Sequence, residues 1–409
     1  AVWIQALILL GSVLGFSVVF LEVDVFNTAS SSASPSHGEE AESTSASPPN
    51  TRSYDRCVIM LVDALRYDMV LNGNMSQVRR IAQLEHTTLL RSMARTPTVT
   101  LPRLKALTTG ALPKFIDVFN NFGSSSIDGD NVIDQLLATK RRSDQKLVMY
   151  GDDTWLKLFP GRFSRADGTT SFFTKDFTQV DDNVTRHLQY DIDPLYEHPH
   201  SKDWELIVLH YLGLDHIGHQ LGSSGRRMEQ KQAEMDDIFH NIYQSLILQD
   251  DIRRQQTTEE DFRPSLLVLA SDHGMTNAGT HGGASASESS AVLLFAPTVD
   301  LVEHPKAKKI TSPVISTSTV EQPDFAPTLA SLLGAHVPER SLGRVITAVI
   351  PGIQRQVCAL RTNAMQMLRQ NVLPFCPDAT LLANEGANLP QQADGSVCDT
   401  VTRAYSQAT

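Results

Sequence analysis

Short runs of consecutive apolar residues recur along the middle of the chain, and several of them stop at an acidic side chain. Three of these runs, each given with the aspartate that ends it, are residues 57–62 with Asp63, residues 204–214 with Asp215, and residues 265–270 with Asp272. Such runs are typical of strands buried on both faces of a parallel sheet. Open α/β sheets bind ligands beyond the carboxyl ends of such strands, so we expect these aspartates to meet at one edge of the sheet.

Further strands and helices are predicted around these runs. The pattern indicates strands at residues 146–150 and 291–296, and helices at residues 75–84, 100–110, 228–248, 322–334 and 360–373. Gly110 and Gly334 are expected to end their helices, because glycine readily adopts the left-handed conformation found there. The alternation of strands and helices predicts an α/β fold with a mainly parallel central sheet flanked by helices.

The predicted helix at residues 100–110 brings a hydroxyl group to its start. Thr100 is followed by Leu101 and Pro102, and proline suits the first helical turn. We therefore expect Thr100 just before the helix N-terminus, where free backbone N–H groups and the helix dipole favour a phosphate group. A hydroxyl in this position is well placed to attack phosphorus.

The two ends of the chain differ from its middle. Residues 1–21 carry no charged side chain and suffice to cross a bilayer core of about 30 Å, which predicts one N-terminal transmembrane helix; a cleaved signal peptide is the alternative. Residues 22–53, rich in Ser and Pro, are predicted to form a flexible tether. The catalytic domain is assigned to residues 54–350, and residues 351–409 form a C-terminal segment that is partly helical.

The composition narrows the class of protein. The chain has 409 residues, of which 41% are hydrophobic and 20% charged, as in a globular enzyme. Its formal net charge of -11 argues against a nucleic-acid-binding protein, which normally carries a basic face. The 4 cysteines are too few for a disulfide framework. Cys57 is expected as a buried thiol, and one pair among Cys358, Cys376 and Cys398 is available for oxidation in a lumen.

Histidines accompany the aspartates and predict metal sites. His219 follows Asp215 by four residues, His273 adjoins Asp272, and His281 lies in the loop of residues 279–283. One catalytic zinc usually takes three protein ligands, so these side chains divide into two groups. The groups are Asp215, His219 and His281, and Asp63, Asp272 and His273 with the Thr100 hydroxyl as a fourth ligand. Two zinc ions, or another divalent pair, about 3.5–4 Å apart would clamp the oxygens of a displacement at phosphorus, with Thr100 as the nucleophile.

Other polar residues lie near these positions. Arg103, in the first turn after Thr100, is the best candidate for a phosphate contact, because guanidinium matches phosphate geometry. Asp152 and Asp153 either contact substrate or are solvated or cap a helix. His210 and His216 either pack on the sheet or line the substrate.

In order along the chain, Asp63, Thr100, Asp215-x-x-x-His219, Asp272-His273 and His281 resemble the metal and nucleophile pattern of the alkaline phosphatase superfamily. More narrowly, several segments are similar to the glycosylphosphatidylinositol (GPI) ethanolamine phosphate transferases: LVDALR at 61–66, TPTVTLPRLKALTTG at 96–110, GDDTW at 151–155, DDNVTRHL at 181–188 and HYLGLDHIGH at 210–219. The segments TVTLPR and NVTRHL are most similar to type 2 of that family. The resemblance covers about residues 57–297.

The resemblance implies an endoplasmic reticulum membrane enzyme with its catalytic domain in the lumen. In this family, Thr100 would take ethanolamine phosphate from phosphatidylethanolamine as a covalent intermediate and pass it to a mannose of the GPI glycolipid, the second mannose for type 2. The two metal groups would be those named above, and a small membrane-protein subunit is a further implied partner. Sequons at Asn74 and Asn183 are compatible with a lumenal glycoprotein.

The chain also departs from its relatives. Members of the family carry a long C-terminal array of transmembrane helices, so we expect this chain to be a fragment or a truncated product. Related phosphodiesterases often place an asparagine after the Thr-x-Pro segment, where this chain has Arg103.

Three other functions fit the same residues. A phosphodiesterase or nucleotide pyrophosphatase would use the same metals and Thr100, with water in place of the sugar hydroxyl. A third-mannose transferase would differ only in its acceptor. A membrane-tethered binding module would keep the fold without catalysis, although the chain retains every ligand and the nucleophile.

Overall fold

The computed structural model describes residues 52–112, 126–127, 129–139, 146–171, 173–196, 203–258, 260–298 and 318–371. The predicted transmembrane helix at residues 1–21 lies outside these ranges, as do most of the predicted tether, Cys376 and Cys398. In the described ranges, no helix is both long and apolar enough to cross a membrane.

An 8-stranded sheet, in the order β4-β3-β5-β1-β6-β7-β2-β8, forms the centre of the described part of the chain. Its strands are β1 Arg56–Val62, β2 Thr88–Met93, β3 Lys146–Asp152, β4 Arg165–Thr169, β5 Trp204–Tyr211, β6 Ser265–Ala270, β7 Ser290–Pro297 and β8 Thr319–Glu321. All pairings are parallel except those of β7 with β2 and β6. The expected α/β fold with a mainly parallel sheet is confirmed, whereas β2, β4 and β8 were not predicted.

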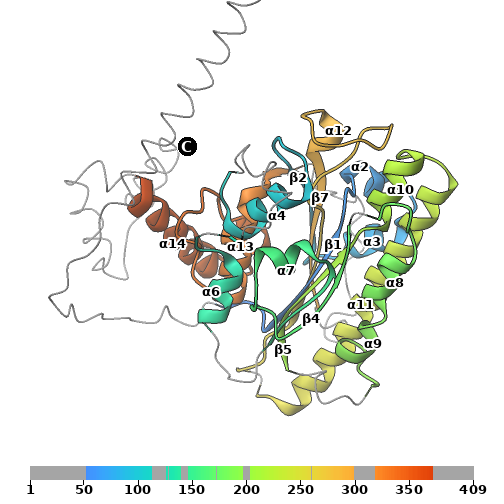
Figure 1. Ribbon diagram of the computed structural model, residues 1–409. Coiled ribbons are helices and arrows are strands. Elements are labelled where there is room, and N and C mark those ends of the chain that lie inside the picture. Colours follow the sequence, from blue (N-terminus) through green and yellow to red (C-terminus); the bar gives the residue numbers. More distant parts are fainter. Residues whose placement is uncertain are drawn as a thin grey trace, which may run out of the picture. The chain divides into compact units, whose positions relative to one another are not determined.

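Helices cover both faces of this sheet (Figure 1). One face packs against α2 Tyr67–Asn72, α3 Ser76–Ile81, α8 Gln179–Thr185, α10 Gly213–Leu221 and α11 Arg226–Gln256, with α9 Leu188–Asp191 beside them. The other face packs against α4 Thr100–Thr109, α6 Val132–Ala138, α7 Thr154–Leu158, α13 Phe325–Leu333 and α14 Ile353–Asn371. Smaller elements are α12 Ala286–Ser289 and the 3-10 turns η2 Gln322–Asp324 and η3 Thr347–Val349.

The alternation of side chains along β1 separates two hydrophobic cores. Val58 and Met60 belong to the core under α11, and Cys57 and Ile59 belong to the core under α13. Successive strand side chains point to opposite faces, so a strand between two helical layers must be apolar throughout. This is why the strand reads as an unbroken apolar run, and why Cys57 is a buried thiol as expected.

Helix ends test the sequence predictions in detail. Gly110 and Gly334, with φ of 70° and 72°, follow the last residues of α4 and α13, as predicted. Helix α11 extends past both ends of the predicted span 228–248, and α14 begins before the predicted residue 360. Both helices continue beyond their strongest apolar pattern through polar residues such as glutamine and arginine, which have good helix propensity.

Among the described residues, the fold continues slightly beyond both ends of the predicted catalytic domain, residues 54–350. Arg52 and Ser53 are buried, and an Arg52 guanidinium nitrogen lies 2.8 Å from a Glu205 carboxylate oxygen. At the other end, the buried Asn363 of α14 accepts a hydrogen bond from the Val345 backbone at 3.0 Å and donates one to the Gly343 carbonyl at 3.2 Å. Helix α14 is therefore fastened to the loop that precedes it.

We predict that Asn363→Ala lowers the free energy of unfolding by about 1–3 kcal/mol, because it leaves buried backbone groups without partners. Chemical denaturation of the purified protein measures this effect. Gln354→Ala, at an exposed position of the same helix, is the control and should change stability little. Equal stability of the two variants would contradict the fastening role of Asn363.

Candidate metal centre

The first metal-binding group forms where two neighbouring parallel strands end. Asp63 follows β1, and Asp272 and His273 follow β6. His273 Nε2 lies 3.2 Å from Asp272 Oδ2 and 3.5 Å from Asp63 Oδ1. Potential ligand atoms of the three residues all lie within 4.8 Å of one another, and all three residues are buried. The predicted convergence of these three side chains is observed.

The atoms that face this point have no hydrogen-bond partner among the described residues: Asp63 Oδ1, Asp272 Oδ2 and His273 Nε2. The opposite atoms are satisfied, since Asp272 Oδ1 accepts from the Ala64 backbone N–H at 3.2 Å and His273 Nδ1 lies 3.0 Å from the Gly274 carbonyl. His273 therefore carries its proton on Nδ1 and turns an Nε2 lone pair toward the carboxylates. Buried orphan lone pairs that converge in this way fit a cation, and such carbonyl partners are typical of metal-ligating histidines.

The second group contains Asp215, His219 and His281. Asp215 was expected at the end of a strand, and this was wrong: β5 ends at Tyr211, and Asp215 lies in the first turn of α10. The helix puts Asp215 and His219, four residues apart, on one face. Asp215 is 3.3 Å from His219 and 3.5 Å from His281, measured between carboxylate oxygen and Nε2.

His281 reaches this group from the loop between β6 and α12. Its Nδ1 lies 2.9 Å from the Thr98 carbonyl, so its proton resides on Nδ1 and its Nε2 carries a lone pair that can bind a metal. Its Nε2 is 2.9 Å from His219 Nε2, and its ring stacks on His273 with centroids 4.1 Å apart. The two groups are therefore immediate neighbours.

The charges of these groups depend on one another. Burial, followed by the charges of Asp272 and Asp215, raises the pKa of Asp63 well above its usual range. Burial would also raise the pKa of Asp215, but His219 and His281 outweigh it and lower that pKa. The hydrogen bond to Asp215 raises the pKa of His219. The protein thus compensates the charge of Asp215 with two histidines and leaves that of Asp63 uncompensated.

Thr100 is the first residue of α4, one position further into the helix than predicted. Its hydroxyl donates a hydrogen bond to Asp63 Oδ2 at 3.3 Å, and the residue is half-buried. The nucleophile candidate therefore contacts a member of the first group and stands at the positive end of a helix dipole.

Arg103 is fully buried, although its sequence position suggested a contact with phosphate. One of its terminal nitrogens donates to Gln322 Oε1 at 3.2 Å, and the Gln322 amide donates to the Asp272 carbonyl. Burial lowers the pKa of Arg103 to about 10, against the opposing charge of Asp272. The guanidinium is thus linked to the first group by hydrogen bonds through Gln322. Its direct contact with phosphate stays a prediction.

The remaining candidates have separate positions. Asp153 pairs with Lys157 at 2.7 Å, and Asp152 is buried at the end of β3. The ring nitrogens of buried His216 lie 2.8 and 3.1 Å from the carbonyls of Asp176 and Ser171. His216 therefore packs against a loop. His210 is buried beside Asp63.

Sequence reasoning missed the residue that holds α10 in place. Asp181 Oδ1 accepts hydrogen bonds from the backbone N–H groups of Leu212 and Gly213 at 2.9 and 3.0 Å, and Asp181 Oδ2 pairs with Lys231 at 2.9 Å. Both charged side chains are buried. Asp181 belonged to a segment singled out for its resemblance, but its distance of more than thirty residues from α10 concealed this contact.

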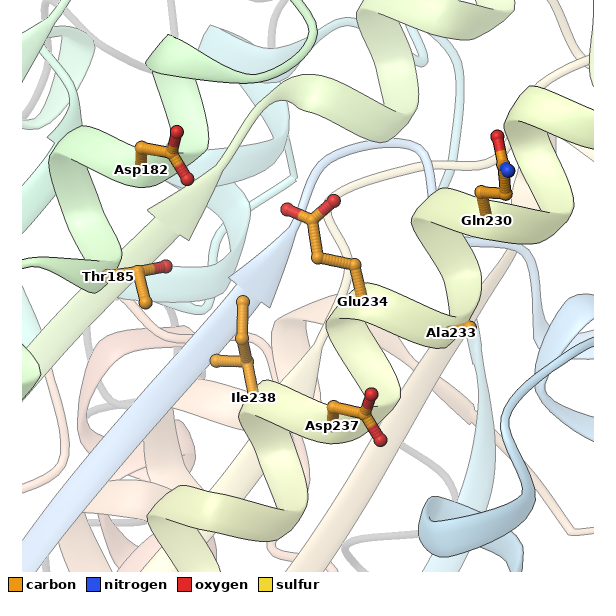
Figure 2. A pocket seen from close by; sticks show the side chains of 7 residues that line it. All are labelled: Asp182, Thr185, Gln230, Ala233, Glu234, Asp237 and Ile238. Carbon is orange, nitrogen blue, oxygen red and sulfur yellow. The ribbon is translucent and has the colours of Figure 1, made fainter.

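A cavity of about 490 Å³ lies elsewhere, between α8 and α11 (Figure 2). Its lining includes the carboxylates of Asp182, Glu234 and Asp237 and no residue of the metal groups. A cavity with this lining does not suit an anionic phosphate, so the chemistry is assigned to the two metal groups.

Comparison with known proteins gives three kinds of match: a family model, solved structures and curated relatives. A family model described as type I phosphodiesterase / nucleotide pyrophosphatase matches residues 145–286, which include Asp215, His219, Asp272, His273 and His281. Among solved structures, murine ectonucleotide pyrophosphatase / phosphodiesterase 5 is 11% identical with a TM-score of 0.46, over 69% of this chain and 96% of that one.

Curated relatives are considerably more similar in sequence. GPI ethanolamine phosphate transferase 2 of Aspergillus fumigatus is 42% identical over 332 residues, which are 77% of this chain and 40% of the relative. The human GPI ethanolamine phosphate transferase 2, catalytic subunit, is 38% identical over 363 residues, 84% of this chain and 33% of the relative. The chain thus spans less than half the length of these relatives.

We predict that Asp181→Ala destabilises the protein by about 3–5 kcal/mol, because it breaks a buried ion pair and uncaps α10. Chemical denaturation measures the loss. Asp182→Ala, an exposed neighbour on α8, should have little effect. A small loss for both variants would remove Asp181 from the support of the site.

The predicted division into two zinc sites implies that His281→Ala lowers bound zinc from about two ions to about one per chain, because it leaves the second group with two protein ligands. Elemental analysis after dialysis gives the stoichiometry. His336→Ala, at an exposed position, should leave it unchanged. Unchanged zinc in the His281 variant would contradict the division into two groups.

Proposed function

Since the chain belongs to the family of the GPI ethanolamine phosphate transferases 2, we propose that it carries the centre that transfers ethanolamine phosphate from phosphatidylethanolamine to a GPI glycolipid. One observation carries the proposal: the Thr100 hydroxyl, at the start of α4, is hydrogen-bonded to Asp63 beside two groups of converging ligand atoms. A nucleophile, a helix N-terminus and cation sites together suit phosphoryl transfer.

The donor step forms a phosphothreonine. Thr100 Oγ1 attacks the phosphorus of phosphatidylethanolamine, and the bond from phosphorus to the diacylglycerol oxygen breaks. Asp63 Oδ2 accepts the hydrogen bond from the Thr100 hydroxyl at 3.3 Å and so holds the proton that must leave the oxygen. That proton ends on the diacylglycerol oxygen.

In the acceptor step, Thr100 is the leaving group instead of the nucleophile. A mannose hydroxyl of the glycolipid attacks phosphorus, the bond to Thr100 Oγ1 breaks, and Thr100 regains a proton from the acceptor hydroxyl. We assign the second mannose as the acceptor, because the relatives described above are type 2 enzymes. The start of α4 lies at the positive end of its dipole and favours the phosphate oxygens in both steps.

Two divalent cations would complete the centre. Asp63, Asp272, His273 and the Thr100 hydroxyl would hold one, and Asp215, His219 and His281 the other. Bound there, such ions supply positive charge to the reacting oxygens and lower the pKa of a coordinated hydroxyl. The mixture of carboxylate and imidazole ligands suits zinc.

The proposed setting is the lumenal side of the endoplasmic reticulum membrane. Both substrates are lipids, so the centre would work next to a membrane, with the N-terminal segment as an anchor and a small membrane-protein subunit as a partner. The Asn74 sequon lies at an exposed turn between α2 and α3, which is compatible with glycosylation in a lumen.

A phosphodiesterase is the second candidate, favoured by the family match over residues 145–286. In that reaction water would replace the mannose hydroxyl in the second step, and the donor step would be unchanged. The two functions therefore differ only in what removes the group from Thr100.

We predict that Thr100→Ala lowers transfer by at least about 1000-fold while zinc content and folding stay unchanged. Mass spectrometry of the Thr100 peptide, after incubation of the protein with phosphatidylethanolamine, should detect an ethanolamine phosphate adduct in the wild type alone. Addition of a GPI precursor should then discharge the adduct onto the glycolipid.

Full activity of Thr100→Ala would eliminate the covalent mechanism. Discharge of the adduct to water at the same rate with and without glycolipid would favour the phosphodiesterase. Wild-type protein that binds no metal would contradict both candidate functions.

A further inference from the structure

A third cluster of titratable side chains adjoins the first metal group. Asp63, Asp152 and His210 bring potential ligand atoms within 4.8 Å of one another, and all three are buried. Asp152 Oδ2 and His210 Nε2 have no hydrogen-bond partner among the described residues. By composition alone this cluster could be a third cation site.

A neighbouring tryptophan decides against that interpretation. The Trp155 indole nitrogen, which can only donate, lies 3.0 Å from His210 Nδ1. His210 Nδ1 must therefore accept, and in a neutral imidazole the proton then resides on Nε2. A protonated Nε2 cannot bind a metal ion, and the lone pair of Nδ1 is already engaged by Trp155.

The remaining N–H group of His210 lies near a candidate metal ligand. His210 Nε2 lies 3.4 Å from Asp63 Oδ2, the same oxygen that accepts from Thr100 at 3.3 Å. We propose that His210 is a positioning residue: its Nε2–H, which has no other partner among the described residues, approaches Asp63 Oδ2 at 3.4 Å, and this electrostatic contact keeps Asp63 Oδ1 directed at the first metal group. Its importance for catalysis rests on the function proposed above, whereas its effect on metal binding does not.

The segment from Gly151 to Trp155 packs around this histidine. Gly151 has φ of 127°, and a Cβ atom there would meet the His210 carbonyl oxygen at 2.0 Å, so only glycine permits this approach of β3 to β5. Asp152 Oδ1 accepts from the Thr154 backbone and hydroxyl at 2.9 and 2.8 Å and thereby shapes the start of α7, which carries Trp155. The Gly-Asp-Asp-Thr-Trp sequence thus places Trp155 against His210.

The tautomer of His210 can be measured without activity. Nitrogen-15 NMR of the metal-free protein, with the His210 signal identified by its loss in His210→Gln, should show a protonated Nε2 and an unprotonated Nδ1. Trp155→Phe should remove this preference. Trp204→Phe is a matched control, because Trp204 is equally buried and donates a 3.0 Å hydrogen bond to the Asp191 carbonyl instead.

Metal affinity then tests the positioning role. Competition between the protein and a zinc chelator should show affinity at the first group lowered by about 10-fold or more in His210→Ala. His210→Gln, which restores an N–H donor near the position of Nε2, should recover most of that loss. Trp155→Phe should weaken zinc binding and Trp204→Phe should not, with circular dichroism establishing that each variant is folded.

The outcomes separate this inference from the proposed function. A proton on Nδ1, or zinc affinity in folded His210→Ala or Trp155→Phe equal to that of the wild type, would overturn the positioning role and leave the Thr100 mechanism intact. A third bound zinc that His210→Ala removes would restore the metal-site interpretation. Suppose that the wild type forms no adduct on Thr100 but shows the expected His210 tautomer, and that His210→Ala and Trp155→Phe bind zinc more weakly. This result would reject the transferase and support the role of His210.

Discussion

The burial of several carboxylates close together at one edge of the sheet is the constraint on which the site depends. Asp63, Asp152, Asp215 and Asp272 are all at most 7% exposed. Burial, followed by the charges of the other three, raises the pKa of Asp63 well above its usual range. Charged groups remain in a protein interior only when opposite charge or hydrogen bonds offset the loss of water. Divalent cations at the two ligand groups would provide that charge.

For three of the candidate ligands, the scaffold occupies one polar atom and leaves another directed at the metal groups. Backbone groups of Ala64, Gly274 and Thr98 take up one polar atom of Asp272, His273 and His281, respectively. Asp181 fixes the start of α10 from a different helix, and His210 is set by Trp155. Such partners fix the orientation of a metal ligand before the metal arrives, which reduces the cost of binding. The two metal groups are thus oriented by a surrounding network of hydrogen bonds.

The sequence predicted the parts of this arrangement that local chemistry determines. Buried parallel strands read as apolar runs, so β1, β5 and β6 and the Asp63, Asp272 and His273 side chains at their ends were predictable. The turn from β5 into α10 was not, because Asp181 caps the helix from a distant segment. For the same reason no local pattern indicated that Arg103 would be buried against Gln322 or that Trp155 would face His210. Contacts between distant segments depend on topology, which a local pattern does not contain.

Anomalous X-ray diffraction at the zinc absorption edge tests the central claim most directly, since it locates metal ions independently of any activity. The account predicts two peaks about 4 Å apart, one among Asp63, Asp272 and His273 and the other among Asp215, His219 and His281. Crystals of zinc-saturated protein with no peak at either group, or with the only peak between Asp152 and His210, would contradict it.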